Sequence, residues 1–227
     1  MKHNYEQAFN FRLPSRMPII MRLDGKCFHT FTQDMDKPFD TKLVTNMTLV
    51  AKKLCENIAG VQMAYIQSDE ISLLIHNYKK FDTEGWFDNE IQKMCSTSAA
   101  IASAYMSSIY KKLVLFDSRV FVLPENEVNN YFIWREQDAT RNSISMLAQS
   151  LHSHKELHKK NSKAMLSMIM EKASSWNDLP LQLQRGSCII KDELSQKWVV
   201  DKKIPLFTNN HNYIDKLLIM EEEWAHK

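Results

Sequence analysis

Three acidic residues stand beside apolar segments of the sequence, where carboxylates can do chemistry if the fold brings them together. Asp24 follows a short apolar run, and Asp69 and Glu70 separate two more, at 61–67 and 71–77. Carboxylates held close together raise each other's pKa values, and divalent cations between them relieve the repulsion. Oxygen ligands suit Mg²⁺, which usually takes one or two carboxylates plus substrate phosphates. Two such ions roughly 4 Å apart would assist a nucleotidyl transfer.

Each acidic feature also has an ordinary structural explanation. Asp24-Gly25 after an apolar segment is typical of a turn. An acidic pair between two strand-like segments is typical of a solvated hairpin tip. Their occurrence at the ends of two segments that can pair favours a functional site.

The residues after Asp24 include types that can bind a nucleotide. Gly25 lets backbone N–H groups approach a triphosphate, and Phe28 can stack on a base. The stretch RLDGKCFHTF (22–31) also allows Phe28 to be a core residue and His29 to be a surface residue. These two residues stay open at this point, whereas Phe31 is expected in the core.

The spacing of apolar residues predicts the elements that position the acids. Leu43, Met47 and Val50 fall on one helical face, Asp40 is a suitable N-cap, and Gly60 ends the helix. The predicted elements are a strand at 17–23, a helix over 40–60, a hairpin of strands 61–67 and 71–77, a helix over roughly 88–110 and a strand at 113–123. The last segment forms one strand, or two if it breaks at Asp117-Ser118.

This order is the βαββαβ pattern of the ferredoxin-like fold. It predicts an α+β protein with a mainly antiparallel sheet and both helices on one face. The first strand and the hairpin pair at the centre of such a sheet, so Asp24 is expected beside Asp69 and Glu70.

The second part of the chain has a different pattern. Beyond Pro124 the sequence is helical and polar to about residue 172, and short strand-like pieces return only at 187–200. We expect a catalytic core over 1–135 and an extension of helices and short strands over 136–227, packed on that core.

Composition restricts the class of protein. The chain has 227 residues, with 29 lysines and arginines against 27 aspartates and glutamates, so a basic surface must be local. Cysteines without a CxxC pair indicate reduced thiols of an intracellular protein; they are Cys27, Cys55, Cys95 and Cys188. Without a signal-like N-terminus or a run of 18 apolar residues, the protein is expected to be cytoplasmic and to have no membrane partner.

Four motifs together resemble the tRNA(His) guanylyltransferase family, and more closely its guanylyltransferase-like branch of 3′-to-5′ RNA polymerases. They are RLDGKCFHTF, Lys37-Pro38, QSDE and WREQD, in this order, and the resemblance covers about residues 5–192. It implies a polymerase-palm-like catalytic core that uses two Mg²⁺ ions. It also implies that ATP adenylylates the 5′-monophosphate of a tRNA, after which the 3′-hydroxyl of an incoming nucleoside triphosphate, such as GTP, attacks that end and releases AMP. An end that already carries a triphosphate needs no activation.

The resemblance also implies roles for individual residues. Asp24 and Asp69 are the catalytic, metal-binding carboxylates, the backbone carbonyl of Gly25 is a further metal ligand, and Glu70 supports the site. The expected nucleotide-binding residues are Gly25, Lys26, Cys27, Phe28, His29, Lys37, Ser68, Asp69 and Arg185. The expected RNA-binding residues are Arg135, Asn142, His154, Lys155, Lys159 and Lys160.

Two of these assignments have a simpler alternative. Lys37 is equally a solvent-exposed lysine before a proline. The basic run SHKELHKKNSK (153–163) is suited to phosphate contacts, but it also has the composition of a solvated loop.

The segment after the WREQD motif favours one activity. Thr140-Arg141-Asn142-Ser143 stands where members that guanylylate tRNA(His) carry His-Ile-Asn-Asn. We therefore expect template-dependent repair of 5′-truncated tRNAs, with tRNA(His) guanylylation as the alternative. The resemblance further implies a homotetramer that binds the tRNA acceptor end and nucleoside triphosphates.

Two other classes compete with this hypothesis. A nucleotidyl cyclase shares the palm, but a diguanylate cyclase has Gly-Gly where Gln67-Ser68 stand. A non-catalytic RNA-binding module of RRM-like topology would carry aromatics on its central strands, and strand 61–67 offers only Tyr65.

Overall fold

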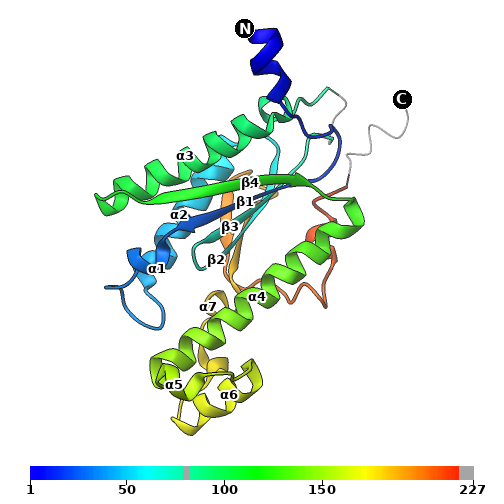
Figure 1. The fold of residues 1–227 in the computed structure, drawn as a ribbon. Helices are drawn as coiled ribbons and strands as arrows, with labels where there is room; N and C mark the ends of the chain where they lie inside the picture. Colours follow the sequence, from blue (N-terminus) through cyan, green and yellow to red (C-terminus); the bar gives the residue numbers. More distant parts are fainter. Residues whose placement is uncertain (79–81, 220–227) are drawn as a thin grey trace.

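The computed structural model describes residues 1–78 and 82–219, which form one antiparallel sheet with helices on both faces (Figure 1). Six strands lie in these residues, in the order β4-β1-β3-β2-β5-β6. Their bounds are β1 Ile19–Lys26, β2 Val61–Gln67, β3 Glu70–Ile75, β4 Leu115–Val122, β5 Ser187–Lys191 and β6 Trp198–Asp201. The first four strands, with the helices between them, have the predicted ferredoxin-like order.

Three long helices cover the sheet. Helices α2 (Thr41–Asn57) and α3 (Ile91–Tyr110) pack with one face of the sheet in one hydrophobic cluster, as predicted. Helix α4 (Glu125–Leu151) packs on the other face in a second cluster. The remaining helices are α1 Phe28–Phe31, α5 His154–Leu157, α6 Ser162–Glu171, α7 Leu181–Arg185 and α8 Asn212–Asp215, and shorter turns lie at Lys2–Glu6, Gln7–Phe9, Trp86–Asn89 and Trp176–Asp178.

Local sequence explains the first long helix. The Asp40 carboxylate accepts a hydrogen bond from the Leu43 N–H at 2.7 Å, which satisfies one of the unpaired donors at the helix start. Gly60 follows the helix with φ +81°, in the left-handed region that favours glycine. A Cβ there would lie 2.7 Å from the His76 carbonyl oxygen, so the connection to β2 requires glycine.

The alternation of β1 decides which side chains reach each face. Ile19, Met21 and Leu23 enter the cluster under α2 and α3, so Arg22 and Asp24 lie on the α4 side. In register, Asp24 lies opposite Glu70 of β3, as predicted, and opposite Asp117 of β4.

The structure corrects several element boundaries. Strand β1 does not end before Asp24 but continues through Gly25 to Lys26, because β4 pairs with it as far as Leu115. The same pairing keeps β4 in one piece across Asp117.

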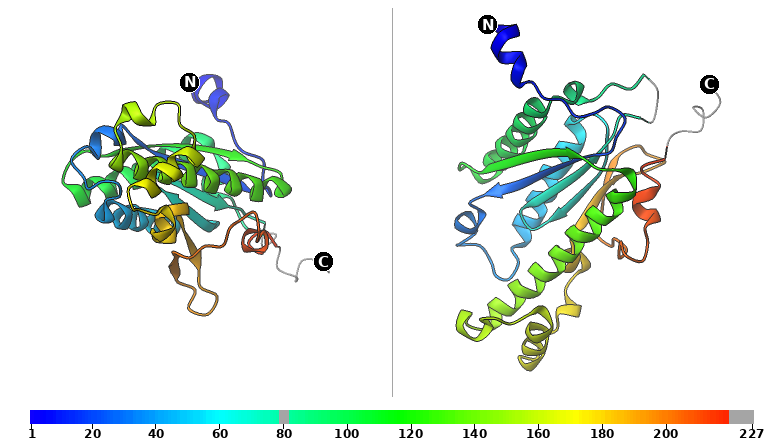
Figure 2. Two further views of the ribbon diagram at one scale, coloured as in Figure 1. Left: turned by 90° about the horizontal axis from the view of Figure 1, so that it is seen from below. Right: turned by 45° about the vertical axis from the view of Figure 1, so that its right-hand side comes forward.

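The predicted boundary at residue 135 falls inside α4, so the two predicted parts share a continuous helix. They also share the sheet, since β5 pairs with β2 and β6 continues beyond it. Figure 2, left, shows the β5–β6 hairpin projecting from the body of the molecule, and Figure 1 shows α5 and α6 at the far end of α4. Within the described residues, no helix is long and apolar enough to span a membrane.

Candidate active site

The predicted acidic residues meet where β1 ends and the β2–β3 hairpin turns. The turn consists of Ser68 and Asp69, and Ser68 has φ +48°. The Gly25 N–H donates a hydrogen bond to the Asp69 carbonyl oxygen at 3.1 Å, which ties this turn to β1. A non-glycine residue in the left-handed region costs free energy and is often found at functional sites.

An open cleft of about 400 Å³ lies over this junction, and we call it the acidic cleft. Its lining residues are Asp24, Gln67, Ser68, Asp69, Glu70, Arg135, Asp138, Asn142, Ser145, Met146 and Gln149. Burial raises the pKa of Asp69, and the charge of Asp24 adds to this rise, while hydrogen bonds to its own backbone and to Ser68 oppose it. The predicted effect of a neighbouring acid is therefore present at Asp69, although burial is the larger cause.

Glu70 is held by an arginine of α4. Arg135 donates to both Glu70 carboxylate oxygens, from Nε at 2.7 Å and from Nη2 at 2.5 Å, and its Nη2 lies 2.9 Å from Asp138. Only 7% of the Arg135 side chain and 9% of the Glu70 side chain is exposed. Burial raises the pKa of Glu70, and the hydrogen bonds and charge of Arg135 oppose that rise.

The ion pair bears on the RNA-binding role expected of Arg135, which stays a prediction. Its guanidinium group is buried and engaged by two carboxylates rather than open to an RNA backbone. It joins the β2–β3 turn to α4, so its contacts suit a positioning residue better than an RNA-binding one.

Asp24 has two basic neighbours to which the sequence motifs assign no role. Its carboxylate lies 3.1 Å from the Arg119 guanidinium and 3.5 Å from Arg22 Nε. Strand periodicity could have found Arg22, because residues two apart share a face of the sheet. Arg119 comes from β4, and only the strand pairing brings it to Asp24.

The donor set at the cleft fits magnesium. Among residues 1–78 and 82–219, no group of three or more His, Cys, Asp or Glu side chains is arranged to hold a metal ion. Glu70 is turned toward Arg135, so of the three expected carboxylates only Asp24 and Asp69 remain available for a metal ion. The two carboxylates still match Mg²⁺, which completes its coordination with water and substrate phosphates. Gly25, whose carbonyl was expected as a further ligand, is not among the residues that line the cleft.

The loop after Asp24 is anchored by Phe28. The Phe28 ring is 5% exposed, and its centroid lies 4.9 Å from that of Phe31 and 5.2 Å from that of Phe116. Phe28 is therefore a core residue rather than a stacking platform, and Phe31 packs against the same core as expected. A Cβ on Gly25 would lie 2.1 Å from the Phe28 ring, which explains the glycine.

The other loop residues keep their side chains in solvent. Lys26, Cys27 and His29 are exposed, and Cys27 has φ +56° where the chain turns into α1. Lys37 is also exposed, and its Nζ donates to the Thr32 carbonyl oxygen at 3.0 Å. None of these four side chains lines the acidic cleft.

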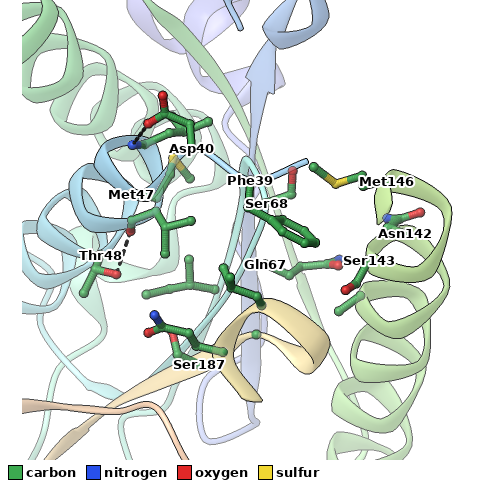
Figure 3. A pocket seen from close by; sticks show the side chains of 17 residues that line it. Phe39, Asp40, Met47, Thr48, Gln67, Ser68, Asn142, Ser143, Met146 and Ser187 are labelled. Atoms are coloured by element: carbon green, nitrogen blue, oxygen red, sulfur yellow. Dashed lines mark hydrogen bonds between the residues drawn. The ribbon is translucent and has the colours of Figure 1, made fainter. Parts of the chain in front are cut away.

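A second, mostly apolar cavity adjoins the acidic cleft, and we call it the apolar cavity (Figure 3). It lies between α2, the end of β2, α4 and α7; its lining is Phe39, Asp40, Leu43, Val44, Met47, Thr48, Ile66, Gln67, Ser68, Ala139, Asn142, Ser143, Met146, Gln182, Leu183, Gly186 and Ser187. In Figure 3, Met47 and Thr48 face Asn142 and Ser143 across it. Its volume of about 90 Å³ is several times what one water needs on this measure, roughly 10–15 Å³.

Arg185 does not reach either cavity. Its Nη1 lies 2.9 Å from Glu136, and its Nη2 donates to the Ile204 carbonyl oxygen at 3.1 Å. The same Glu136 accepts a hydrogen bond from the Phe207 N–H. This pair joins α4 to α7 and to the segment after β6, so the Arg185 guanidinium already has partners within the protein. The expected contact of Arg185 with a nucleotide stays a prediction.

Of the expected RNA-binding residues of the extension, only Asn142 lies at the acidic cleft. Asn142 is exposed and lines both cavities. The other four, His154, Lys155, Lys159 and Lys160, are exposed on and just after α5 and line neither of these two cavities. Ser153 caps α5 through a reciprocal capping box with Glu156, so the basic run is ordered locally.

A ferredoxin-like sheet with carboxylates at the end of a central strand, beside a mostly apolar cavity, is consistent with the palm-like core of a nucleotidyltransferase. The family model for tRNAHis guanylyltransferase matches residues 1–124. The chain belongs to that family, whose members are tRNA nucleotidyltransferases.

Individual relatives agree with this assignment. A bacterial tRNA(His) guanylyltransferase-like protein, solved in complex with ATP, is 44% identical, with a TM-score of 0.93 over 96% of this chain and 97% of that one. A similar bacterial protein in complex with GTP is 42% identical, with a TM-score of 0.87. The tRNA(His) guanylyltransferase of Debaryomyces hansenii is 30% identical over 60% of this chain and 54% of its own length. An uncharacterised protein of Acanthamoeba polyphaga mimivirus is 24% identical over 94% of this chain and 85% of its own.

Proposed function

We propose that this protein repairs tRNA by adding nucleotides to truncated 5′ ends in the 3′-to-5′ direction, with the opposite strand as template. The observation that carries the proposal is the contact between the apolar cavity and the acidic cleft, which share Gln67, Ser68, Asn142 and Met146. A nucleoside triphosphate fits this pair of sites, with its base in the first and its phosphates in the second.

In this proposal the activating nucleotide is ATP, as in the complex of the bacterial relative. Asp24, Asp69 and the Gly25 carbonyl are the residues that would hold Mg²⁺ in this proposal. When bound, the metal neutralises phosphate charge and activates the attacking oxygen. Arg22 and Arg119 lie next to Asp24, so their guanidinium groups add positive charge on the same side of the cleft.

The chain's own residues fix the geometry of the reaction. Arg135 holds Glu70 on one side of the turn, and the Gly25 N–H holds Asp69 on the other. These contacts place the Asp69 carboxylate before a substrate arrives, and such preorganisation supplies part of the rate enhancement. Lys37 lies two residues before Phe39 of the apolar cavity, close enough in sequence to serve the activating nucleotide.

The choice of repair over tRNA(His) guanylylation rests on two observations. Thr140 and Arg141 replace the His-Ile pair at this position, and the bacterial guanylyltransferase-like protein is similar along nearly the whole chain. The exposed basic run around His154 to Lys160 contacts the tRNA in this proposal. We expect the enzyme to work in the cytoplasm as a homotetramer.

A labelled tRNA without its 5′ nucleotide tests the proposal. The tRNA carries a 5′-monophosphate and is incubated with protein, Mg²⁺, ATP and each nucleoside triphosphate in turn, and the products are resolved on a sequencing gel. Extension only by the nucleotide complementary to the opposing base supports repair. Addition of guanosine opposite any base would instead indicate tRNA(His) guanylylation. No adenylylated end and no extension refute both activities.

Variants connect this activity to the acidic cleft. Asp24→Asn and Asp69→Asn should abolish adenylylation and extension while the protein remains folded. Asp178→Asn is the control, because Asp178 is exposed in the turn at Trp176–Asp178 and does not line the cleft. Extension by either cleft variant at the wild-type rate would contradict the metal assignment.

A further inference from the structure

Gln67 occupies an unusual position at the active site. It is the last residue of β2, it is 5% exposed, and it lines both the apolar cavity and the acidic cleft. Figure 3 shows its side chain next to Ser143 of α4. Within the described part of the chain, its Oε1 is a buried oxygen with no hydrogen-bond partner. A buried acceptor without a partner costs free energy, so it requires an explanation.

The orientation of the Gln67 amide follows from its neighbour. Gln67 lies directly opposite Glu70 in the hairpin, so both side chains are on the α4 face. A carboxylate only accepts hydrogen bonds, so the amide must present its NH₂ group to Glu70. The opposite orientation would place two acceptors against each other, which leaves Oε1 as the free group.

The place of Gln67 between the two sites indicates its partner. If a base occupies the apolar cavity and phosphates occupy the acidic cleft, the ribose that joins them lies at the shared wall. An amide oxygen can only accept, and the ribose carries hydroxyl donors at that place. We propose that Gln67 Oε1 accepts a hydrogen bond from a ribose hydroxyl of the activating nucleotide and thereby selects ribonucleotides; this inference rests on the proposed function.

A base amine is the other donor that a nucleotide offers. The exocyclic amine of adenine lies at the end of the base remote from the ribose. Gln67 lies on the wall that faces the phosphate side of the apolar cavity, not at its remote end. The position of Gln67 therefore favours the sugar.

Equilibrium binding tests the inference without any RNA. ATP, 2′-deoxyATP and 3′-deoxyATP are titrated calorimetrically into the wild-type protein and into Gln67→Met, with Mg²⁺ present. Methionine keeps the length of the side chain and removes the amide. Wild type should bind ATP about ten-fold more tightly than at least one deoxy analogue, as loss of one buried hydrogen bond predicts. In Gln67→Met that ratio should fall to about one, through weaker binding of ATP alone.

Gln62→Met is the matched control, because Gln62 lies on the same strand but lines neither cavity. It should keep the wild-type ratio. Equal wild-type affinity for ATP and both deoxy analogues overturns the inference without any variant, as does an equal loss for all three nucleotides in Gln67→Met.

The outcome is separable from that of the proposed function. Ribose discrimination in binding without nucleotide addition to RNA would refute the repair activity and leave the role of Gln67 intact. Addition to RNA with no discrimination between ATP and its deoxy analogues would support the repair activity and refute the role of Gln67.

Discussion

Removal of the Arg135 guanidinium should expose how strongly the catalytic turn depends on α4. Arg135→Met leaves the Glu70 carboxylate buried without its bidentate partner at 2.5 and 2.7 Å. Breaking a buried ion pair by removing one partner typically costs about 3–5 kcal/mol. Because the pair borders the open acidic cleft, we expect the lower end, about 3 kcal/mol.

The double variant Glu70→Gln/Arg135→Met separates the cost of an unpaired charge from the value of the pair. It leaves no uncompensated charge between the two positions, so most of the loss should be recovered. Urea unfolding followed by circular dichroism measures both variants. With a slope of about 2 kcal/mol/M, the single variant should unfold about 1.5 M earlier than wild type.

The two variants also separate stability from activity. The double variant no longer holds the turn to α4, so nucleotide addition should fall at least ten-fold although the protein is stable, because small displacements of catalytic groups are costly. A loss below about 1 kcal/mol in Arg135→Met would refute the reasoning about a buried pair. Wild-type activity in the double variant would refute the positioning role.

Three further predictions concern the loop, a buried thiol and the activation step. Gly25→Ala should lower stability by about 1–3 kcal/mol and weaken ATP binding, because its Cβ would overlap the Phe28 ring; an unchanged melting temperature would contradict this. Burial raises the pKa of Cys55 to about 12, so above pH 9 the unfolded thiol loses its proton while the folded one keeps it. Its contribution to stability should fall by about 1.4 kcal/mol per pH unit between pH 9 and 12. Burial also raises the pKa of Cys188, so urea unfolding should show that Cys55→Ala reduces the decline of stability with pH by this amount, while Cys27→Ala at an exposed position leaves the decline unchanged. Lys37→Ala should reduce addition to monophosphorylated RNA far more than to triphosphorylated RNA, and equal losses in gel assays would exclude a role in activation.

Some of the architecture follows from short-range patterns in the sequence. The apolar spacing after Asp40 predicts α2, and its N-cap hydrogen bond confirms the start of that helix. Strand alternation and the βαββαβ order predict that Asp24 lies beside Glu70, which the register confirms. Helical and strand periods are set within a few residues, so such features can be predicted without knowledge of distant partners.

The partners of the charged side chains were decided only by tertiary structure. Glu70 and Arg135 are 65 residues apart, and the sequence marks both as functional without showing that they form a pair. Arg185 likewise resembles a nucleotide-binding residue in the sequence. In the structure its guanidinium group forms an ion pair with Glu136, 49 residues away.

The same holds for uncharged side chains, because burial depends on what packs above them. From the sequence, Phe28 could stack on a base or fill the core. In the structure its ring packs against Phe116 of β4, in the core. Gln67 belongs to the QSDE motif but has no role assigned from the sequence. In the structure it lies opposite Glu70 and lines both the apolar cavity and the acidic cleft. The sequence by itself determined the elements and the family motifs. The packing of α4 and β4 around the hairpin decided which side chains remain free for a ligand, because each buried polar group must find a partner across long sequence distances.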